Sequence, residues 1–348
     1  MGKDSVHQRS RHILSVFFKF LLPLIITVGL CYILFAKQDV SEMIRIALQE
    51  CNYWWIALAL GLSVVSHVVR AMRWQLQLRA INVNAPLFTV VLSIFGTYAV
   101  NLLFPRLGEL WRTGYIAQRE DAPFDAVFGS MVADRLADTI TVALLMLSTL
   151  MLAGGPLMDF LRENGAKSTL DGLVAIATSP MVWAVIVVLV MVAIVALMRF
   201  KTAPLVVKIL DFFKGIWRGF AAITTMKGRG RWLLLTVCIW GCYFLQLYVA
   251  FFAFPATAQV VADYGIGAVA VCFLLSSIAM VIPSNGGIGP WQIAVMFGLS
   301  IYASGIPELT SNYAASFANL VLGSQTLLLV LLGIFTFISI AIQKRKDV

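Results

Sequence analysis

Charge is scarce in this sequence. Only 12% of its 348 residues are Asp, Glu, Lys or Arg, about half the fraction that soluble domains carry. Hydrophobic residues make up 60% of the chain and the mean hydropathy is +0.90. Several apolar runs reach the roughly 20 residues that a bilayer-spanning helix needs. The composition excludes an ordinary soluble domain and predicts an all-α polytopic membrane protein.

Histidine and cysteine are also scarce. The three histidines, His7, His12 and His67, are dispersed, and the five cysteines lack the spacing of a disulfide framework or a thiolate metal site. The sequence also has no nucleotide-binding glycine loop and no evident pair of nucleophile and base. These absences argue against an enzyme, and no cofactor or metal is expected.

Basic residues outnumber acidic ones, which gives a formal net charge of +9. In a membrane protein such an excess marks the cytoplasmic loops rather than a nucleic-acid site. Four basic and eight acidic residues lie in the segments assigned to the outside, which are 37–52, 154–180, 255–265 and 305–313. This asymmetry predicts a multi-pass protein of the cell (inner) membrane with both termini in the cytoplasm and no nucleic-acid partner.

Six apolar segments are long enough to cross the membrane completely. They are 16–36, 53–72, 126–153, 181–198, 232–254 and 314–342. The second of these is expected to leave the membrane through a basic exit formed by Arg70, Arg73 and Arg79.

Two further apolar segments are too short for a comfortable crossing and end at breaks that contain glycine and proline. Residues 87–104 stop at 105–108, and residues 266–282 stop at 283–290, after which 291–304 is apolar again. Irregular backbone is tolerated at membrane depth only where protein or a watery cavity surrounds it. Each break therefore predicts a re-entrant helical hairpin that enters and leaves on the same side.

The predicted segments fall into two halves, 16–153 and 181–342, with the same order of span, span, hairpin and span. The first half starts inside and the second starts outside, which predicts an inverted repeat within one membrane domain, 1–348. Interrupted segments at corresponding positions are typical of transporter binding sites. We therefore expect 105–112 and 283–292 to face each other near the membrane midplane.

The most basic segment of the chain links the two halves. Residues 199–231 contain eight Lys or Arg against a single acid, Asp211, and their apolar residues recur at helical spacing. This pattern predicts an amphipathic helix that lies on an anionic membrane surface. A helix packed on the bundle is the alternative.

The first interrupted segment places charge close to membrane depth, where charge is usually functional. Arg106 and Arg112 offer planar donor groups suited to phosphate, with Glu109 between them. Asp134 and Asp138 follow on the next span, one helical turn apart and on one face. Three roles stay open for the carboxylates: holding an ammonium headgroup, carrying a coupling proton, or neutralising the arginines in a structural network.

The second interrupted segment is rich in glycine. The backbone amides around Gly286, Gly287 and Gly289 can approach an anion closely because glycine has no side chain. Asn101 and Asn285 are expected to cap the broken helices, with ligand contact as the alternative. Helix starts after each tip add positive dipole ends. The two tips together predict a site for a lipid phosphate.

These motifs resemble the flippase-like family. The resemblance covers nearly the whole chain and is carried by Asn101 with 105–112, by Asp134 with Asp138, and by 283–289. This family is the membrane region of lysylphosphatidylglycerol synthases together with its stand-alone relatives. The resemblance implies a membrane protein that handles lipids, with transfer between leaflets as the usual inferred activity.

Two departures from the family pattern bear on function. The synthase relatives continue into a soluble aminoacyl-transfer domain, whereas this chain ends six residues after its last predicted span, so transferase activity is not expected. A glutamate commonly follows the glycine-rich tip in the family, where this sequence has Gln292. If that carboxylate couples protons or binds a cationic headgroup, this protein lacks that function.

The leading hypothesis is a lipid translocase that binds a phospholipid headgroup in a cavity between the two hairpins. Translocation of a polyprenyl-phosphate carrier in envelope glycan assembly shares the phosphate requirement and stays open. A non-transport scaffold for envelope synthesis, acting through 199–231, is the alternative from another class. The sequence leaves open which lipid is bound, the direction of transfer, any ion coupling and the oligomeric state.

Overall fold

The structure is a computed structural model of the chain. It describes residues 38–104, 106–163, 226–280, 282 and 284–346, with isolated positions at 25–32, 179–191 and 214–221. Most of two predicted spans, 16–36 and 181–198, and most of the basic segment 199–231 lie outside the described residues. Pro105 and Pro283 lie outside them as well.

All regular elements in the described part of the chain are helices, which confirms the predicted all-α class. They are α3 (Val40–Glu50), α4 (Tyr53–Ala80), α5 (Leu87–Leu103), α6 (Leu107–Arg119), α7 (Phe124–Glu163), α11 (Arg229–Phe251), α12 (Pro255–Ala279), α13 (Pro290–Ser300), the short 3-10 helix η2 (Ala303–Gly305) and α14 (Ser311–Lys346).

Local sequence explains where several of these helices begin. The Asp39 carboxylate accepts hydrogen bonds from the amides of Ser41 and Glu42 and so caps α3. The Ser41 hydroxyl also donates to Asp39, and these bonds hold the pKa of the Asp39 carboxyl below its usual value. Asn52 caps α4 in the same way, by accepting from the amide of Trp54. Helices α12 and α13 both start with proline, which needs no amide partner in the first turn.

Four described helices are long and apolar enough to cross a membrane, namely α4, α11, α12 and α14. Helices α4 and α14 include the predicted spans 53–72 and 314–342, and α11 includes the first part of 232–254, up to Phe251. Helix α7 covers the predicted span 126–153 and continues to Glu163. The prediction of a loop at 255–265 was wrong, because α12 starts at Pro255 and passes through a kink at Gly265, where φ is 70°. Glycine adopts this left-handed conformation without a Cβ clash, so the chain stays helical on both sides of the kink.

Helices α5 and α6 form an antiparallel hairpin around the first break. A Cβ added to Gly96 of α5 would lie 2.2 Å from the Trp111 ring of α6. A Cβ added to Gly108 of α6 would lie 2.1 Å from the carbonyl oxygen of Thr97 in α5. Gly96 meets Trp111, whereas the later residue Asn101 meets the earlier residue Gly108, which is the register of two antiparallel arms. Glycine at both positions lets the two backbones approach closely.

The second part of α12 and α13 form an antiparallel hairpin around the second break. A Cβ added to Gly298 of α13 would lie 2.6 Å from the sulfur of Cys272 in α12, and one added to Gly287 would lie 2.6 Å from the Met280 sulfur. The structure therefore has helical hairpins where both breaks were predicted. Their re-entrant course through a membrane stays a prediction.

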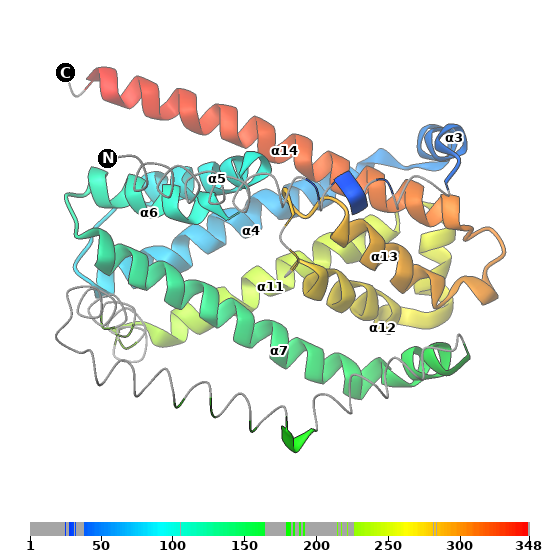
Figure 1. Ribbon diagram of the computed structural model, residues 1–348. Coiled ribbons are helices and arrows are strands. Elements are labelled where there is room, and N and C mark those ends of the chain that lie inside the picture. Colours follow the sequence, from blue (N-terminus) through cyan, green and yellow to red (C-terminus); the bar gives the residue numbers. More distant parts are fainter. Residues whose placement is uncertain are drawn as a thin grey trace, which may run out of the picture.

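Figure 1 shows how the long helices lie relative to one another. Helices α4 and α11 pack against each other in the middle, α7 runs along one edge and α14 along the opposite edge. The first hairpin packs through α5 on α14, and the second packs through α12 on α7. Each hairpin thus contacts a long helix that is distant from it in sequence.

The apolar core has two parts. The larger one joins α3, α4 and α11–α14, with Phe251, Phe254 and Phe317 packed edge to face at its centre. The smaller one joins α4 to α7 and contains the fully buried side chains of Trp74 and Ile116. Trp74 also borders the polar site described next.

Candidate functional site

A group of buried charged side chains joins α4, α6 and α7. We call it the charged cluster, and its members are Arg70, Arg73, Glu109, Arg112, Asp134, Arg135 and Asp138. Charged side chains inside a membrane protein are rare and face the protein interior.

Arg73 binds both aspartates of the charged cluster, Asp134 and Asp138. Its Nη2 donates to Asp134 Oδ1 at 2.6 Å and to Asp138 Oδ1 at 2.7 Å, and its Nε donates to Asp134 Oδ1 at 3.0 Å. Arg73 and Asp134 are both 0% exposed. Asp134 and Asp138 lie on one helix face, as predicted, and both accept hydrogen bonds from the same guanidinium.

Arg70 extends this contact to α11. Its Nη1 donates to Asp138 Oδ2 at 2.7 Å, and its Nε donates to the Tyr243 hydroxyl at 3.2 Å. Arg73 Nη1 similarly donates to the Thr236 hydroxyl of α11 at 3.3 Å. Two arginines of α4 thus connect α7 with the central helix of the second half.

Glu109 connects the first hairpin to α7. It accepts from Arg135 Nη2 at 2.7 Å and from Asn101 Nδ2 at 3.2 Å. The Asn101 Oδ1 also accepts from the Gly108 amide at 2.8 Å, at the start of α6. This is the capping role expected of Asn101, and the Glu109–Arg135 pair is the more exposed part of the cluster.

Arg112 differs from the other arginines. Its side chain is 0% exposed, its guanidinium stacks 4.4 Å from the Trp74 ring centre, and Nη2 lies 3.5 Å from Asp134 Oδ2. Among the described residues, none of its guanidinium nitrogens has a hydrogen-bond partner, and neither does Asp134 Oδ2. A buried donor group of this strength without acceptors is unusual in proteins.

The charges within the cluster do not cancel. Four arginines meet three carboxylates, so one positive charge is in excess. Because Arg112 has the poorest set of acceptors, the excess falls on it. Among the described residues, the cluster therefore carries one uncompensated positive charge, at Arg112.

The second hairpin tip contacts the first one, as predicted for the two breaks. Asn285 Nδ2 donates to the carbonyl oxygens of Leu102 and Leu103, where α5 ends, at 3.1 and 3.3 Å. A Cβ added to Gly286 would lie 2.4 Å from the Leu102 side chain. The Asn285 amide thus donates hydrogen bonds to carbonyl oxygens at the end of α5, which have no partner within the helix.

Other residues of the second tip are engaged within it. The backbone φ angles of Gly286, Gly287 and Gly289 are 63°, 85° and 94°. The Gly289 amide donates to Gln292 Oε1 at 2.6 Å, and Gln292 Nε2 donates to Asn319 Oδ1 of α14 at 2.8 Å. Gln292 is therefore a helix cap and a link to α14 in this conformation, and the Gly289 amide is occupied.

The sequence matches the family described as the lysylphosphatidylglycerol synthase TM region over residues 20–333, which is most of the chain. The chain belongs to this family. It is also similar to the UPF0104 membrane protein PH1989 of Pyrococcus horikoshii, with 27% identity over 139 residues. That stretch covers 39% of this chain and 41% of the relative. No solved structure matches the chain.

Membership of the lysylphosphatidylglycerol synthase TM-region family confirms the resemblance read from the motifs. With the apolar helices, it makes the chain a multi-pass membrane protein of a lipid-related family. Of the predicted site residues, Glu109, Arg112, Asp134 and Asp138 come together in the cluster, and Asn101 donates to Glu109 at its edge.

The structure places Arg106, Arg70 and Arg73 differently from what the sequence predicted. Arg106 is exposed at the tip, with a left-handed φ of 64°. The prediction that Arg70 and Arg73 form a basic exit was wrong, because they are 3% and 0% exposed and pair with aspartates; only Arg79 of that set is exposed. The sequence contained a sign of this pairing, because Arg70 and Arg73 are three residues apart and share a helix face.

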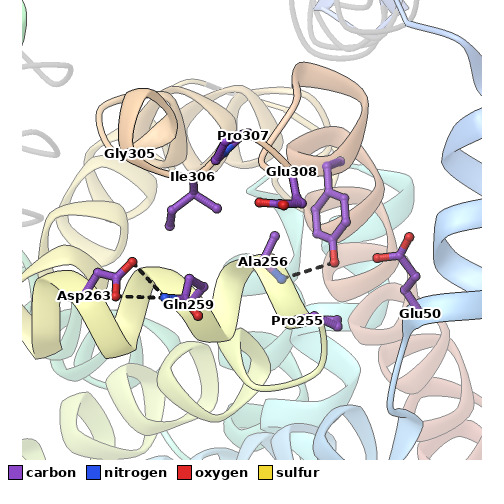
Figure 2. A pocket seen from close by; sticks show the side chains of 10 residues that line it. Glu50, Pro255, Ala256, Gln259, Asp263, Gly305, Ile306, Pro307 and Glu308 are labelled. Carbon is purple, nitrogen blue, oxygen red and sulfur yellow. Dashed lines mark hydrogen bonds between the residues drawn. The ribbon is translucent and has the colours of Figure 1, made fainter.

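A pocket lies at another place in the molecule, where three of the segments predicted to be outside converge (Figure 2). It has a volume of about 400 Å³ and includes carboxylates from each segment: Glu50, Asp263 and Glu308. Among the described residues, its lining contains no Lys or Arg. Within the described ranges no three His, Cys, Asp or Glu side chains are grouped closely enough to hold a metal ion.

Proposed function

We propose that this protein binds the phosphate of a membrane lipid beside Arg112 and transfers the lipid between leaflets. The observation that carries the proposal is the Arg112 guanidinium, which is fully buried and has no hydrogen-bond acceptor among the described residues. Leaving a buried donor unsatisfied costs roughly 1–3 kcal/mol, and more when the donor is charged. A ligand that supplies acceptors removes this cost.

A phosphate group suits the chemistry of Arg112. Its oxygens match the planar donor fork of a guanidinium and form short, charge-assisted hydrogen bonds. One phosphate monoanion also neutralises the excess positive charge of the cluster. Phospholipids and polyprenyl phosphates share this group, so the transport assay has to show which of these lipids is transferred.

Access to Arg112 requires a movement, since its side chain is 0% exposed. Helix α6 carries Glu109 and Arg112, and α7 carries their partners Arg135 and Asp134. We propose that α6 moves away from α7 as lipid enters and that the partly exposed Glu109–Arg135 pair breaks first. In this view the chain is a carrier with re-entrant hairpins, and it works without a catalytic step or a cofactor.

We also propose that the two halves are an inverted repeat in the cell (inner) membrane, with both termini cytoplasmic and 199–231 against the anionic leaflet. The convergence of 37–52, 255–265 and 305–313 around one acidic pocket supports this topology, because segments predicted on one side lie at one end of the fold. Labelling of single cysteines in intact cells with a membrane-impermeant maleimide tests it. Labelling at 308 and protection at 345 is expected, and the reverse pattern contradicts the topology.

The transport proposal is tested with purified protein in vesicles that hold fluorescent phosphatidylglycerol, phosphatidylethanolamine or polyprenyl phosphate. Wild-type protein should expose inner-leaflet label to an external quencher faster than empty vesicles do. Arg112→Met should abolish this transfer while leaving the thermal unfolding midpoint nearly unchanged, because the arginine makes no hydrogen bond among the described residues. Arg79→Met is the matched control, an exposed arginine on α4.

The outcomes separate binding from structure. If Arg112→Met transfers lipid as fast as wild type, the proposal is wrong. If Arg112→Met fails to fold while Arg79→Met folds, Arg112 stabilises the cluster instead of binding ligand. Arg112→Lys adds a further check, because it keeps the charge but loses the planar fork and should transfer lipid more slowly than wild type.

A further inference from the structure

Helix α3 has one apolar face that packs on the protein. Met43 and Ile46 are 5% and 3% exposed, and Ile46 belongs to the larger core. The Ser316 hydroxyl of α14 donates to the Met43 carbonyl oxygen at 2.8 Å. This face packs α3 against the rest of the protein.

A second apolar face of α3 is uncovered. Val40, Ile44 and Leu48 recur every four residues, so they form one stripe along the helix. Their exposed fractions are 48%, 54% and 70%, and they increase toward the end of the helix. A helix packed on a water-facing protein surface would carry polar residues in this stripe.

Polar residues of α3 occupy the next face around the helix. Ser41, Arg45 and Gln49 are all exposed and follow each stripe residue by one position, about 100° further round. The order around the helix is therefore a face on the protein, an exposed apolar stripe and a water-facing polar face. This order is typical of helices that lie in a membrane interface.

The orientation of α3 agrees with such a position. In Figure 1, α3 is seen end-on, whereas α4 and α14 are seen lengthwise. Polar contacts tie it to the first turn of α14: Gln38 donates to the Ser311 hydroxyl, the Asp39 amide donates to Asn312, and Asn312 donates to Glu42. Because α4 and α14 are candidate spans, a helix lying across their ends lies parallel to the membrane surface.

The exposed stripe leads directly into an aromatic group at the start of α4. Trp54 is 84% exposed and Tyr53 is 48% exposed, and the Tyr53 hydroxyl donates to the Ala47 carbonyl oxygen at 2.8 Å. Tyrosine and tryptophan concentrate at membrane–water interfaces. Further along α4, Leu58 and Val65 are each 49% exposed. The stripe is thus continuous in sequence with the lipid-facing side of a span.

We propose that α3 lies in the headgroup layer of the membrane, with Val40, Ile44 and Leu48 turned into the acyl boundary. The partner is lipid rather than a second copy of the chain. Three side chains form too small a patch for a stable protein interface, which needs roughly 800 Å² on each partner. Interfacial helices bury their apolar face about 5–10 Å into this boundary. Glu50, at the end of α3, lines the acidic pocket, which therefore opens at headgroup level (Figure 2).

The test uses single nitroxide labels on the full-length protein in nanodiscs. Cysteines are placed singly at the stripe positions 40, 44 and 48 and at the polar positions 41, 45 and 49, in a background without the native cysteines. The stripe labels should be more accessible to oxygen than to a water-soluble nickel chelate, and the polar labels should show the reverse. Circular dichroism and elution volume of the cysteine-free background provide the folding control.

Two results would overturn the proposal. Nickel accessibility equal at all six positions would place the stripe in water. Stripe labels inaccessible to both reagents and dipolar-broadened would mean that a second copy covers the stripe. Ile44→Glu gives a check without cysteine: its folded protein should show weaker quenching of interfacial tryptophan by lipids brominated near the headgroup, while Arg45→Glu should not.

Discussion

In the hairpin of α5 and α6, charged side chains make the contact to the neighbouring long helix, through Glu109 to Arg135 and Arg112 to Asp134. In the hairpin of α12 and α13, the corresponding polar contact is neutral, from Gln292 to Asn319. Both hairpins bring their arms together through glycine. The arms therefore form by the same means, while the attachment of each hairpin differs in charge.

This difference bears on function because charge is an expensive way to attach two helices. Desolvation of a buried ion pair can exceed its Coulomb attraction, and apolar residues of similar volume are often at least as stabilising. The second hairpin shows that a neutral amide pair suffices in the same kind of fold. Four arginines and three carboxylates around the first hairpin are thus more than attachment alone requires, which supports the proposal of a lipid phosphate beside Arg112.

The largest effect is expected from Asp134→Ala. This change leaves Arg73 and Arg112 buried without their shared carboxylate, and breaking a buried pair in this way costs about 3–5 kcal/mol. The unfolding midpoint in detergent should fall steeply or no folded protein should be recovered. Asn319→Ala, at the neutral contact of the second hairpin, should lower the midpoint much less. Equal losses would show that the two attachments are energetically alike.

A smaller effect is expected where the arms of the first hairpin meet. Gly108→Ala places a Cβ 2.1 Å from the Thr97 carbonyl oxygen, and this backbone contact cannot be relieved by a side-chain rotation. Overpacking of this kind costs about 1–3 kcal/mol. Gly114→Ala on the same helix is the control, since a Cβ there meets nothing within 4 Å. Thermal unfolding of the two variants measures the difference, and equal midpoints would argue against the tight approach.

Gln292→Ala tests the neutral attachment. The change removes the hydrogen bonds to the Gly289 amide and to Asn319, for a loss of roughly 1–2 kcal/mol in the free energy of unfolding. Gln292→Glu should lose less, because a carboxylate still accepts from the Gly289 amide and only the hydrogen bond to Asn319 Oδ1 is lost. A Glu variant less stable than the Ala variant would mean that the site rejects charge, unlike the first hairpin.

The smallest effect is expected from Glu109→Gln. Its partner Arg135 keeps 34% of its side-chain surface exposed, so the pair is screened by solvent and contributes under about 1 kcal/mol. The midpoint should hardly change, since glutamine still accepts from Asn101. A loss as large as that of Asp134→Ala would place Glu109 in the rigid part of the cluster instead of at its opening edge.

The helices could be predicted because apolar runs and breaker residues act locally. Spans at 53–72 and 314–342 fall within α4 and α14, the span at 232–254 overlaps α11 up to Phe251, and a hairpin formed at each break. The loop predicted at 255–265 was wrong because this stretch is helical, and Gly265 only kinks α12. Hydropathy detects where helices are interrupted but not how sharply.

The site was harder to predict because its partners are distant in sequence. The Arg73–Asp134 contact joins residues 61 apart, and Arg70–Tyr243 joins residues 173 apart. Near the end of a span, an arginine facing the interior has the same sequence context as one leaving the membrane. Gln292 likewise lies in 283–292, the stretch expected to form half of the ligand site, and only the turn geometry shows that it accepts from the Gly289 amide.

The bridge from Asn285 to the end of α5 has a consequence for how the chain is made. The carbonyl of Leu102 obtains its donor from a residue synthesised 183 positions later. Helix α5 likewise obtains its cover from α14, the last helix of the structure. During membrane insertion the first hairpin therefore stays incompletely capped and partly uncovered until the final quarter of the chain has been translated. Ribosome-bound chains that stop before residue 285 should leave this hairpin open to proteases and chaperones.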